Sequence, residues 1–250
     1  MASDGAARAR SNTFIYVLLA LGAVLTTVDF LLAFFVAPLV VGAQVSEVRE
    51  IGGTFVQNQL LFSQKIFYFH VPVAISSFLV FFFTAYYGVR FLMTKKKEYD
   101  TRAKIATEVT LLFVVLTLIT GDLWTRFEWG KWWVWEPRLT TYFIMTLLVI
   151  AYFVLRNSIE DEERRATYAA AFGIIAFIDA PISFMITRIV PSSVHPVVLR
   201  SGGGLEGSQL AAFLLGLFGM LMLAWAVYQV RLREEFLKER LDAAKAAMEG

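Results

Sequence analysis

Long apolar segments alternate with short charged segments along all 250 residues of the chain. Because an α-helix needs about 20 apolar residues to cross the hydrocarbon core of a bilayer, this pattern indicates membrane-spanning helices. We predict an all-α integral membrane bundle of six transmembrane helices in a single domain, residues 1–250, with spans at about residues 14–41, 66–93, 105–123, 141–155, 168–190 and 210–230. A charged, helix-favouring tail covers residues 231–250.

The first apolar run is longer than the apolar core of a cleaved signal peptide, so we expect an uncleaved first helix. Asp29 in this run and Asp179 in the fifth span are acids at membrane depth, where they are costly unless paired, protonated or facing a cavity. The sequence leaves open whether their role is structural or functional. Pro181 closely follows Asp179, which predicts a break in the fifth span. The acidic run at residues 160–163 predicts a solvated turn and a helix cap.

Basic residues gather on one side of the predicted bundle. Six spans place both termini on the same side, and 16 of the 23 Lys and Arg residues fall in the segments on that side. By the positive-inside rule, the N and C termini are therefore cytoplasmic. The segment at residues 124–140, His195 and the end of the span that carries His70 then all lie on the outer side of the membrane.

The composition excludes several other classes of protein. Hydrophobic residues make up 58% of the chain, and a soluble domain of this length cannot bury so much apolar surface. The chain has no cysteine, which excludes disulfides, thiolate metal sites and covalent c-type heme attachment to this chain. A net charge of only +2 gives no reason to expect a nucleic-acid partner.

The connection between the third and fourth spans is rich in tryptophan. Five of the six tryptophans lie between Trp124 and Trp135, and we call residues 124–140 the tryptophan-rich segment. Four of its side chains follow i, i+3, i+4, i+7 spacing, which on a helix is one face: Trp129, Trp132, Trp133 and Glu136. Trp135 would lie off that face.

Anchoring at the membrane interface explains one or two tryptophans but not five in so short a segment. Arg126 and Arg138 lie among and beside them. Aromatic side chains stack on flat apolar ligands, and guanidinium groups pair with carboxylates. The segment is therefore typical of a surface that binds a flat, largely apolar ligand with acidic edges.

The chain has two histidines, His70 and His195. Each taken alone is more typical of a hydrogen-bonded core residue or a solvated loop residue than of a ligand. Together, on the outer side with the tryptophan-rich segment, they form a plausible axial pair for heme iron. A zinc site is a weaker interpretation, because two imidazoles would need further ligands and no cluster of carboxylates accompanies them.

The run Trp-Gly-Lys-Trp-Trp-Val-Trp-Glu-Pro-Arg-Leu-Thr at residues 129–140 resembles the signature of the tryptophan-rich (WWD-type) heme-handling proteins. Its Arg-Leu-Thr ending is most similar to the cytochrome c maturation protein C family (CcmC, heme exporter protein C). The resemblance extends to chain length, six spans, the Phe-His-Val-Pro run at residues 69–72, and residues 179–183 ahead of the second outer histidine.

This resemblance implies a protein that binds heme b and delivers it for cytochrome c maturation. It implies that His70 and His195 are axial ligands of the iron and that Arg138 binds a propionate. The other cofactor-binding residues that it indicates are Lys65, Trp129, Trp132, Trp133, Trp135 and Glu136, which replaces the family's usual aspartate. Arg126, within the segment, is a further candidate for orienting a propionate.

The family also implies partners in the inner membrane. They are a membrane-anchored heme chaperone (CcmE-like), an ABC-type ATPase with its membrane subunit (CcmA/CcmB-like) and a small membrane subunit (CcmD-like). The chain itself is then a transfer protein and not an enzyme. Two alternatives stay open: a cytochrome c synthase-like membrane enzyme that attaches heme directly, and a b-type heme electron-transfer subunit.

Overall fold

The structure is a computed structural model that describes residues 2–38, 49–51, 54–56, 63–190, 205 and 207–249. It is built almost entirely of helices: α1 (Ala2–Phe35), α2 (Ser63–Thr94), α3 (Lys97–Trp129), α4 (Pro137–Asn157), α5 (Glu162–Phe177), α6 (Asp179–Ile189) and α7 (Ser208–Glu249). Strands β1 (Arg49–Ile51) and β2 (Thr54–Val56) form a small antiparallel hairpin between α1 and α2, with Glu50 opposite Phe55.

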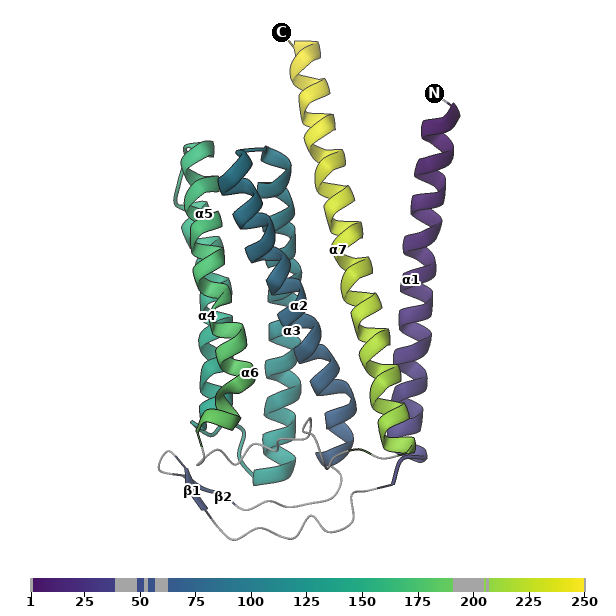
Figure 1. Ribbon diagram of the computed structural model, residues 1–250, viewed down its shortest axis with the longest axis vertical. Helices are drawn as coiled ribbons and strands as arrows, with labels where there is room; N and C mark the ends of the chain where they lie inside the picture. Colours follow the sequence, from purple (N-terminus) through teal and green to yellow (C-terminus); the bar gives the residue numbers. More distant parts are fainter. Residues whose placement is uncertain are drawn as a thin grey trace.

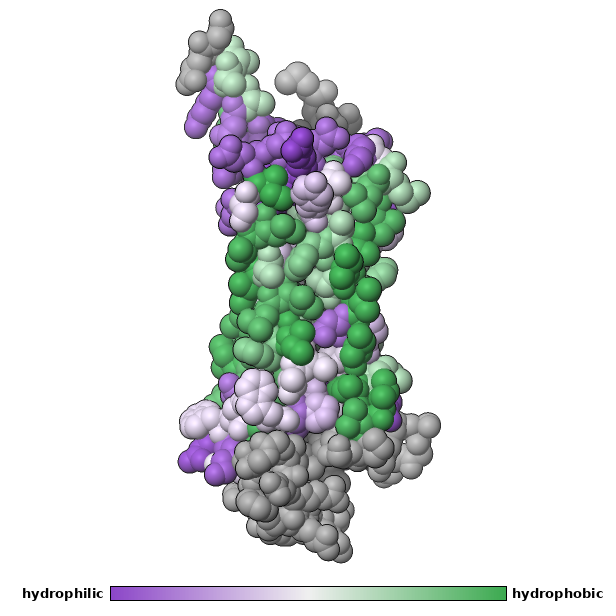
Figure 2. Space-filling view, turned by 90° about the vertical axis from the view of Figure 1, so that its left-hand side faces the viewer, coloured by the Kyte–Doolittle hydropathy of each residue, from purple (hydrophilic) through white to green (hydrophobic). Residues whose placement is uncertain are grey.

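The prediction of six transmembrane helices is confirmed. The stretches that are long and apolar enough to cross a membrane are Asn12–Phe35, Gln64–Thr94, Lys97–Trp129, Pro137–Asn157, Glu162–Ile189 and Ser208–Met248. An apolar band runs across the middle of the molecule between more polar ends, as Figure 2 shows for one face. The protein is therefore a multi-pass membrane protein.

The helices run up and down, so that both termini lie at the same end of the bundle (Figure 1). We call the opposite end the distal end; α1, α3 and α6 end there, and α2, α4 and α7 begin there. Helix α2 is central, because it packs against α1, α3, α5 and α7. The tryptophan-rich segment joins α3 to α4 and therefore lies at the distal end (Figure 1).

The predicted break in the fifth span is confirmed. Helix α5 ends at Phe177, the N–H of Ile178 donates to the carbonyl of Ile175, and α6 begins at Asp179. Pro181 lies in the first turn of α6, where a proline costs little because the backbone N–H groups there have no helical acceptor. The break gives α6 a start of its own in the distal half of the bundle.

Helices α1, α2 and α7 approach closely at Gly216. Pro72 within α2 has no N–H, so the carbonyl of Tyr68 cannot accept the usual helical hydrogen bond from residue 72. A Cβ atom on Gly216 would lie 3.0 Å from this carbonyl oxygen and 2.7 Å from Cγ of the buried Asp29. Glycine is therefore required at this position for α7 to pack against both helices.

We expect Gly216→Ala to destabilise the protein by about 1–3 kcal/mol, because the added methyl overlaps atoms of two neighbouring helices. Thermal unfolding in mild detergent measures the effect. The same substitution in an Asp29→Ala background should cost less, since one of the overlapping groups is then removed. Equal costs in the two backgrounds, or no loss of Tm, would contradict this account of the contact.

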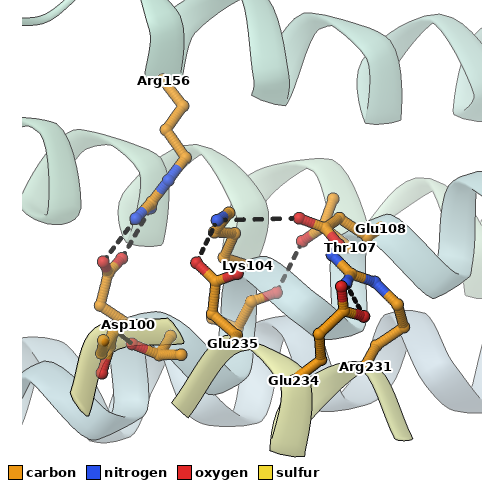
Figure 3. A network of polar contacts seen from close by, with 11 residues as sticks. Asp100, Lys104, Thr107, Glu108, Arg156, Arg231, Glu234 and Glu235 are labelled. Carbon is orange, nitrogen blue, oxygen red and sulfur yellow. Dashed lines mark hydrogen bonds and ion pairs between the residues drawn. The ribbon is translucent and has the colours of Figure 1, made fainter. Parts of the chain in front are cut away.

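Ion pairs tie α3 to α4 and α7 (Figure 3), toward the end of the bundle that carries the termini (Figure 1). Arg156 of α4 donates to both carboxylate oxygens of Asp100 in α3, at 2.7 and 2.5 Å. Lys104 of α3 lies 2.7 Å from Glu235 of α7, and Arg231 of α7 lies 2.7 Å from Glu108 of α3. The structure thus places charged contacts between helices at one end and the tryptophan-rich segment at the other.

Candidate functional site at the distal end

The tryptophan-rich segment is not one continuous helix. Helix α3 ends at Trp129 because Gly130 adopts a left-handed conformation with a φ of 69°, which glycine tolerates best. Residues 131–136 are not helical, and α4 begins only at Pro137. The expectation that Trp129, Trp132, Trp133 and Glu136 share one helical face is therefore wrong.

The turn after α3 is held by side chains of α3 itself. The Thr125 Oγ1 atom lies 2.8 Å from the carbonyl oxygen of Trp132 and donates to it. The Arg126 guanidinium donates to the carbonyl of Gly130 at 2.5 Å and lies 5.8 Å from the centre of the Trp132 ring. Arg126 therefore shapes the turn and covers one face of an exposed indole.

The indoles form two groups that differ in burial. Trp129 is buried, and the Trp124 ring meets its ring edge-on at 4.9 Å. Trp132 and Trp135 are 60% and 57% exposed. Trp133 joins the two groups, since it packs against the buried cluster of Trp129 and meets Trp135 edge-on at 5.4 Å. The surface that could stack on a ligand is therefore narrower than five tryptophans suggest.

Glu136 lies below this surface. It is fully buried, and its carboxylate accepts a hydrogen bond of 2.7 Å from the N–H of Leu139, which caps the N-terminus of α4. Its carbonyl accepts from both the N–H and the hydroxyl of Thr140, and Pro137 occupies the first position of the helix. The carboxylate thereby fixes where α4 starts and how the segment enters it.

His70 lies on α2, seven residues from the start of the helix at the distal end. Its Nδ1 atom lies 2.9 Å from Oγ1 of Thr120 in α3. Its Cε1 atom would lie 3.3 Å from a Cβ atom on Gly121, so the glycine makes room for the imidazole against α3. Within the part of the chain that the structure describes, no hydrogen-bond partner is found for Nε2.

Arg138 lies near the end of the tryptophan-rich segment, in the first turn of α4, and is partly buried. The charges of Glu136 and of Arg188 in α6 act on the Arg138 guanidinium, and the charge of Arg138 acts on His70 of α2, so these side chains form one electrostatic neighbourhood. Among the described residues, no hydrogen bond or ion pair of the Arg138 guanidinium is found. A partly buried cation in this state is suited to an anionic ligand.

Arg188 is a member of this neighbourhood that the sequence analysis missed. It lies in the last turn of α6, donates to the carbonyl of Phe184 at 3.3 Å and lies over the Phe184 ring. The sequence feature that could have identified Arg188 is its position, since it is an arginine at the outer end of the fifth predicted span.

Lys65 is directed toward α1. It is buried, and its ammonium donates to the carbonyl of Ala37, just beyond the end of α1. Gln209 of α7 donates to the neighbouring carbonyl of Pro38 at 3.0 Å. These contacts join the ends of α1, α2 and α7. The second predicted iron ligand, His195, lies outside the described residues.

The described residues are suited to a ligand that contains a chelated metal ion. No group of three or more His, Cys, Asp or Glu side chains that could hold a bare metal ion occurs within the described ranges. The distal end offers one imidazole nitrogen, a partly buried guanidinium and two exposed indoles. An apolar macrocycle with acidic edges and a chelated metal matches this set.

Together the fold and the candidate site define a polytopic membrane protein with an aromatic, cationic surface at the end opposite its termini. The profile of one family, heme exporter protein C (CcmC), matches residues 1–247. The chain therefore belongs to the heme exporter protein C family, and membership implies a role in heme handling for cytochrome c maturation within the Ccm system.

Relatives span bacteria and plants. The heme exporter protein C of Bradyrhizobium diazoefficiens is 31% identical over 183 residues, which cover 71% of this chain and 68% of that protein. The heme exporter protein C of Escherichia coli K12 is 24% identical over 175 residues, 70% of this chain and 71% of that protein. A cytochrome c biosynthesis ccmC-like mitochondrial protein of Marchantia polymorpha is 35% identical over 118 residues, about half of each chain.

Proposed function

We propose that this protein binds heme b at the distal end and presents it to a membrane-anchored heme chaperone (CcmE-like) during cytochrome c maturation. The observation that carries the proposal is the placement of His70. Its imidazole is held by Thr120 on one side and lies near Arg138, which has no hydrogen-bond or ion-pair partner within the described ranges. Family membership supplies the ligand class that fits this arrangement.

The residues divide into those that contact heme and those that build the surface. His70 and His195 bind the iron, and Arg138 pairs with a propionate. The exposed Trp132 and Trp135 stack on the macrocycle. The buried or engaged side chains support these contacts from behind: Lys65, Arg126, Trp129, Trp133 and Glu136.

The distal end faces the outer, periplasmic side of the cytoplasmic membrane, and both termini face the cytoplasm. The positive-inside rule supports this orientation, because 16 of the 23 basic residues fall in the segments on the side of the termini. The ion pairs that join α3 to α4 and α7 in Figure 3 then lie toward the cytoplasmic side.

The chain acts as a transfer protein that makes and breaks no bond in its cargo. Its partners are the heme chaperone, an ABC-type ATPase with its membrane subunit (CcmA/CcmB-like) and a small membrane subunit (CcmD-like). Heme is exposed at one edge of the site so that a ligand from the chaperone reaches it, which agrees with the exposure of Trp132 and Trp135.

The proposal is tested by loading the purified protein with heme in detergent and adding the purified chaperone. We expect the heme to leave this chain and to reach the chaperone. Trp132→Ala should lower heme occupancy several-fold through lost stacking. Trp225→Phe is the matched control, because Trp225 lies on α7 in a separate cluster with Phe83 and Tyr228.

Two results would overturn the proposal. One is that the wild type binds no heme at any heme concentration, although both it and the Trp225→Phe variant are folded. The other is formation of holocytochrome from apocytochrome and heme by this chain without the chaperone, which would identify a synthase.

A further inference from the structure

We propose that Thr120 and Gly121 of α3 are positioning residues for His70: they fix the proton on Nδ1 and orient Nε2, with its lone pair, toward the ligand. This inference rests on the proposed function and identifies the nitrogen that binds iron. It also assigns a role to a helix that supplies no heme ligand of its own.

The first step concerns the hydroxyl hydrogen of Thr120. The Oγ1 atom lies 2.8 Å from the carbonyl oxygen of Leu116 and 3.1 Å from that of Thr117, both in α3. A threonine in a helix donates its hydroxyl hydrogen to such a carbonyl. Because the hydroxyl has only one hydrogen, its oxygen then faces His70 as an acceptor.

The second step concerns the imidazole. Nδ1 lies 2.9 Å from that oxygen, so Nδ1 is the atom that carries a proton and donates it. A neutral imidazole has one N–H, and the other nitrogen, Nε2, therefore has a free lone pair. Nε2 has no partner among the described residues, which leaves it available to a metal. The hydrogen bond selects this tautomer before the cargo arrives.

The third step concerns the space beside the ring. Gly121 is the next residue of α3, and a Cβ atom there would lie 3.3 Å from Cε1 of His70. Cε1 joins the two ring nitrogens, so a methyl group at this position forces the imidazole to shift by a few tenths of an ångström and moves Nε2 with it. A glycine in the middle of a helix is otherwise unfavourable compared with alanine, which argues that the space has a use.

This arrangement matches a general property of metal-binding histidines. Their second nitrogen donates to a fixed oxygen, which sets the ring orientation and raises the basicity of the metal-binding nitrogen, and loss of that oxygen typically weakens metal binding by about 10–100-fold. In this chain the oxygen belongs to a neighbouring helix, 50 residues away in sequence.

The direct test is nitrogen NMR on heme-free protein with 15N-labelled histidine. The chain has two histidines, so a His195→Asn variant leaves the signals of His70 alone. We expect a protonated Nδ1 and an unprotonated Nε2. The opposite tautomer, or an even mixture of both, would overturn the inference, and the measurement needs no heme and no altered α3.

Variants of α3 give a second, independent test. Thr120→Val removes the acceptor and should abolish the single tautomer and weaken heme binding by about 10–100-fold. Thr120→Ser keeps the hydroxyl and should retain both the single tautomer of His70 and the wild-type affinity for heme. Gly121→Ala should weaken heme binding without lowering the Tm, because the helix gains from alanine while the ring is displaced. Wild-type affinity and an unchanged tautomer in Thr120→Val would sink the proposal.

The two proposals fail in different ways. If the wild type binds heme but His70 carries its proton on Nε2, only the positioning role is lost. If His70 carries its proton on Nδ1 but the wild type binds no heme, the contact with Thr120 exists and the proposal of heme delivery is wrong.

Discussion

Alanine in place of His70 is expected to weaken heme binding by more than about 100-fold, because the proposed axial ligand is lost together with the contact that orients it. The Soret band of the loaded protein should disappear at heme concentrations that saturate the wild type. Absorption spectra during titration with heme measure the change. The rest of the site, including Arg138 and the exposed indoles, is left in place.

Added imidazole provides the matching control. The truncated side chain leaves a space between α2 and α3 next to Thr120 and Gly121, and free imidazole can enter it and restore part of the Soret band. Unfolding measurements on the heme-free variant separate loss of the ligand from loss of the fold. A variant that keeps wild-type affinity for heme would show that His70 is not an iron ligand.

Arg156→Ala is expected to lower the free energy of unfolding by about 3–5 kcal/mol, since it leaves the carboxylate of Asp100 without its partner in a poorly solvated place. The two side chains are only 11% and 10% exposed, and two hydrogen bonds join them. Reversible unfolding in mixed detergent micelles, followed by tryptophan fluorescence, measures the loss.

A surface pair at the same end of the molecule serves as the control. Lys97 and Glu162 lie 2.7 Å apart, but their side chains are 64% and 63% exposed. Lys97→Ala should therefore cost less than about 1 kcal/mol. Replacing both Asp100 and Arg156 with apolar residues should restore most of the stability lost in Arg156→Ala. If the two alanine variants lose equal stability, burial does not govern the strength of the Asp100–Arg156 pair.

Much of the fold was predictable because a bilayer imposes length and polarity on each span. The six spans and the break before Asp179 follow from apolar runs and from Pro181, and both are found in the structure. Asp161, in the predicted acidic turn, caps α5 by accepting from the N–H of Arg164 at 2.8 Å. Each of these features depends on residues that are neighbours in the sequence.

The site was less predictable because its contacts join distant parts of the chain. The helical spacing from Trp129 to Glu136 is interrupted at Gly130, where α3 ends in a left-handed conformation; the glycine itself is the local sequence signal against one continuous face. The family resemblance places Lys65 and Glu136 among the heme-binding residues. In the structure the first holds the end of α1, and the second caps α4.

The partners of His70 show the same limit. Thr120 and Gly121 lie within an ordinary apolar span, and nothing in their local sequence relates them to a histidine on another helix. Their relevance depends on the packing of α2 against α3, which hydropathy does not specify.

The contact between His70 and Thr120 makes the proposed binding of heme depend on the register of α2 against α3. Because the imidazole belongs to α2 and the hydroxyl to α3, a slide of one helix past the other by a single turn, about 5.4 Å, would separate them. Nε2, the nitrogen that we propose as the iron ligand, would then lose its fixed orientation, and heme would be held more weakly. A partner protein that shifted α2 against α3 would then weaken heme binding without contacting the heme.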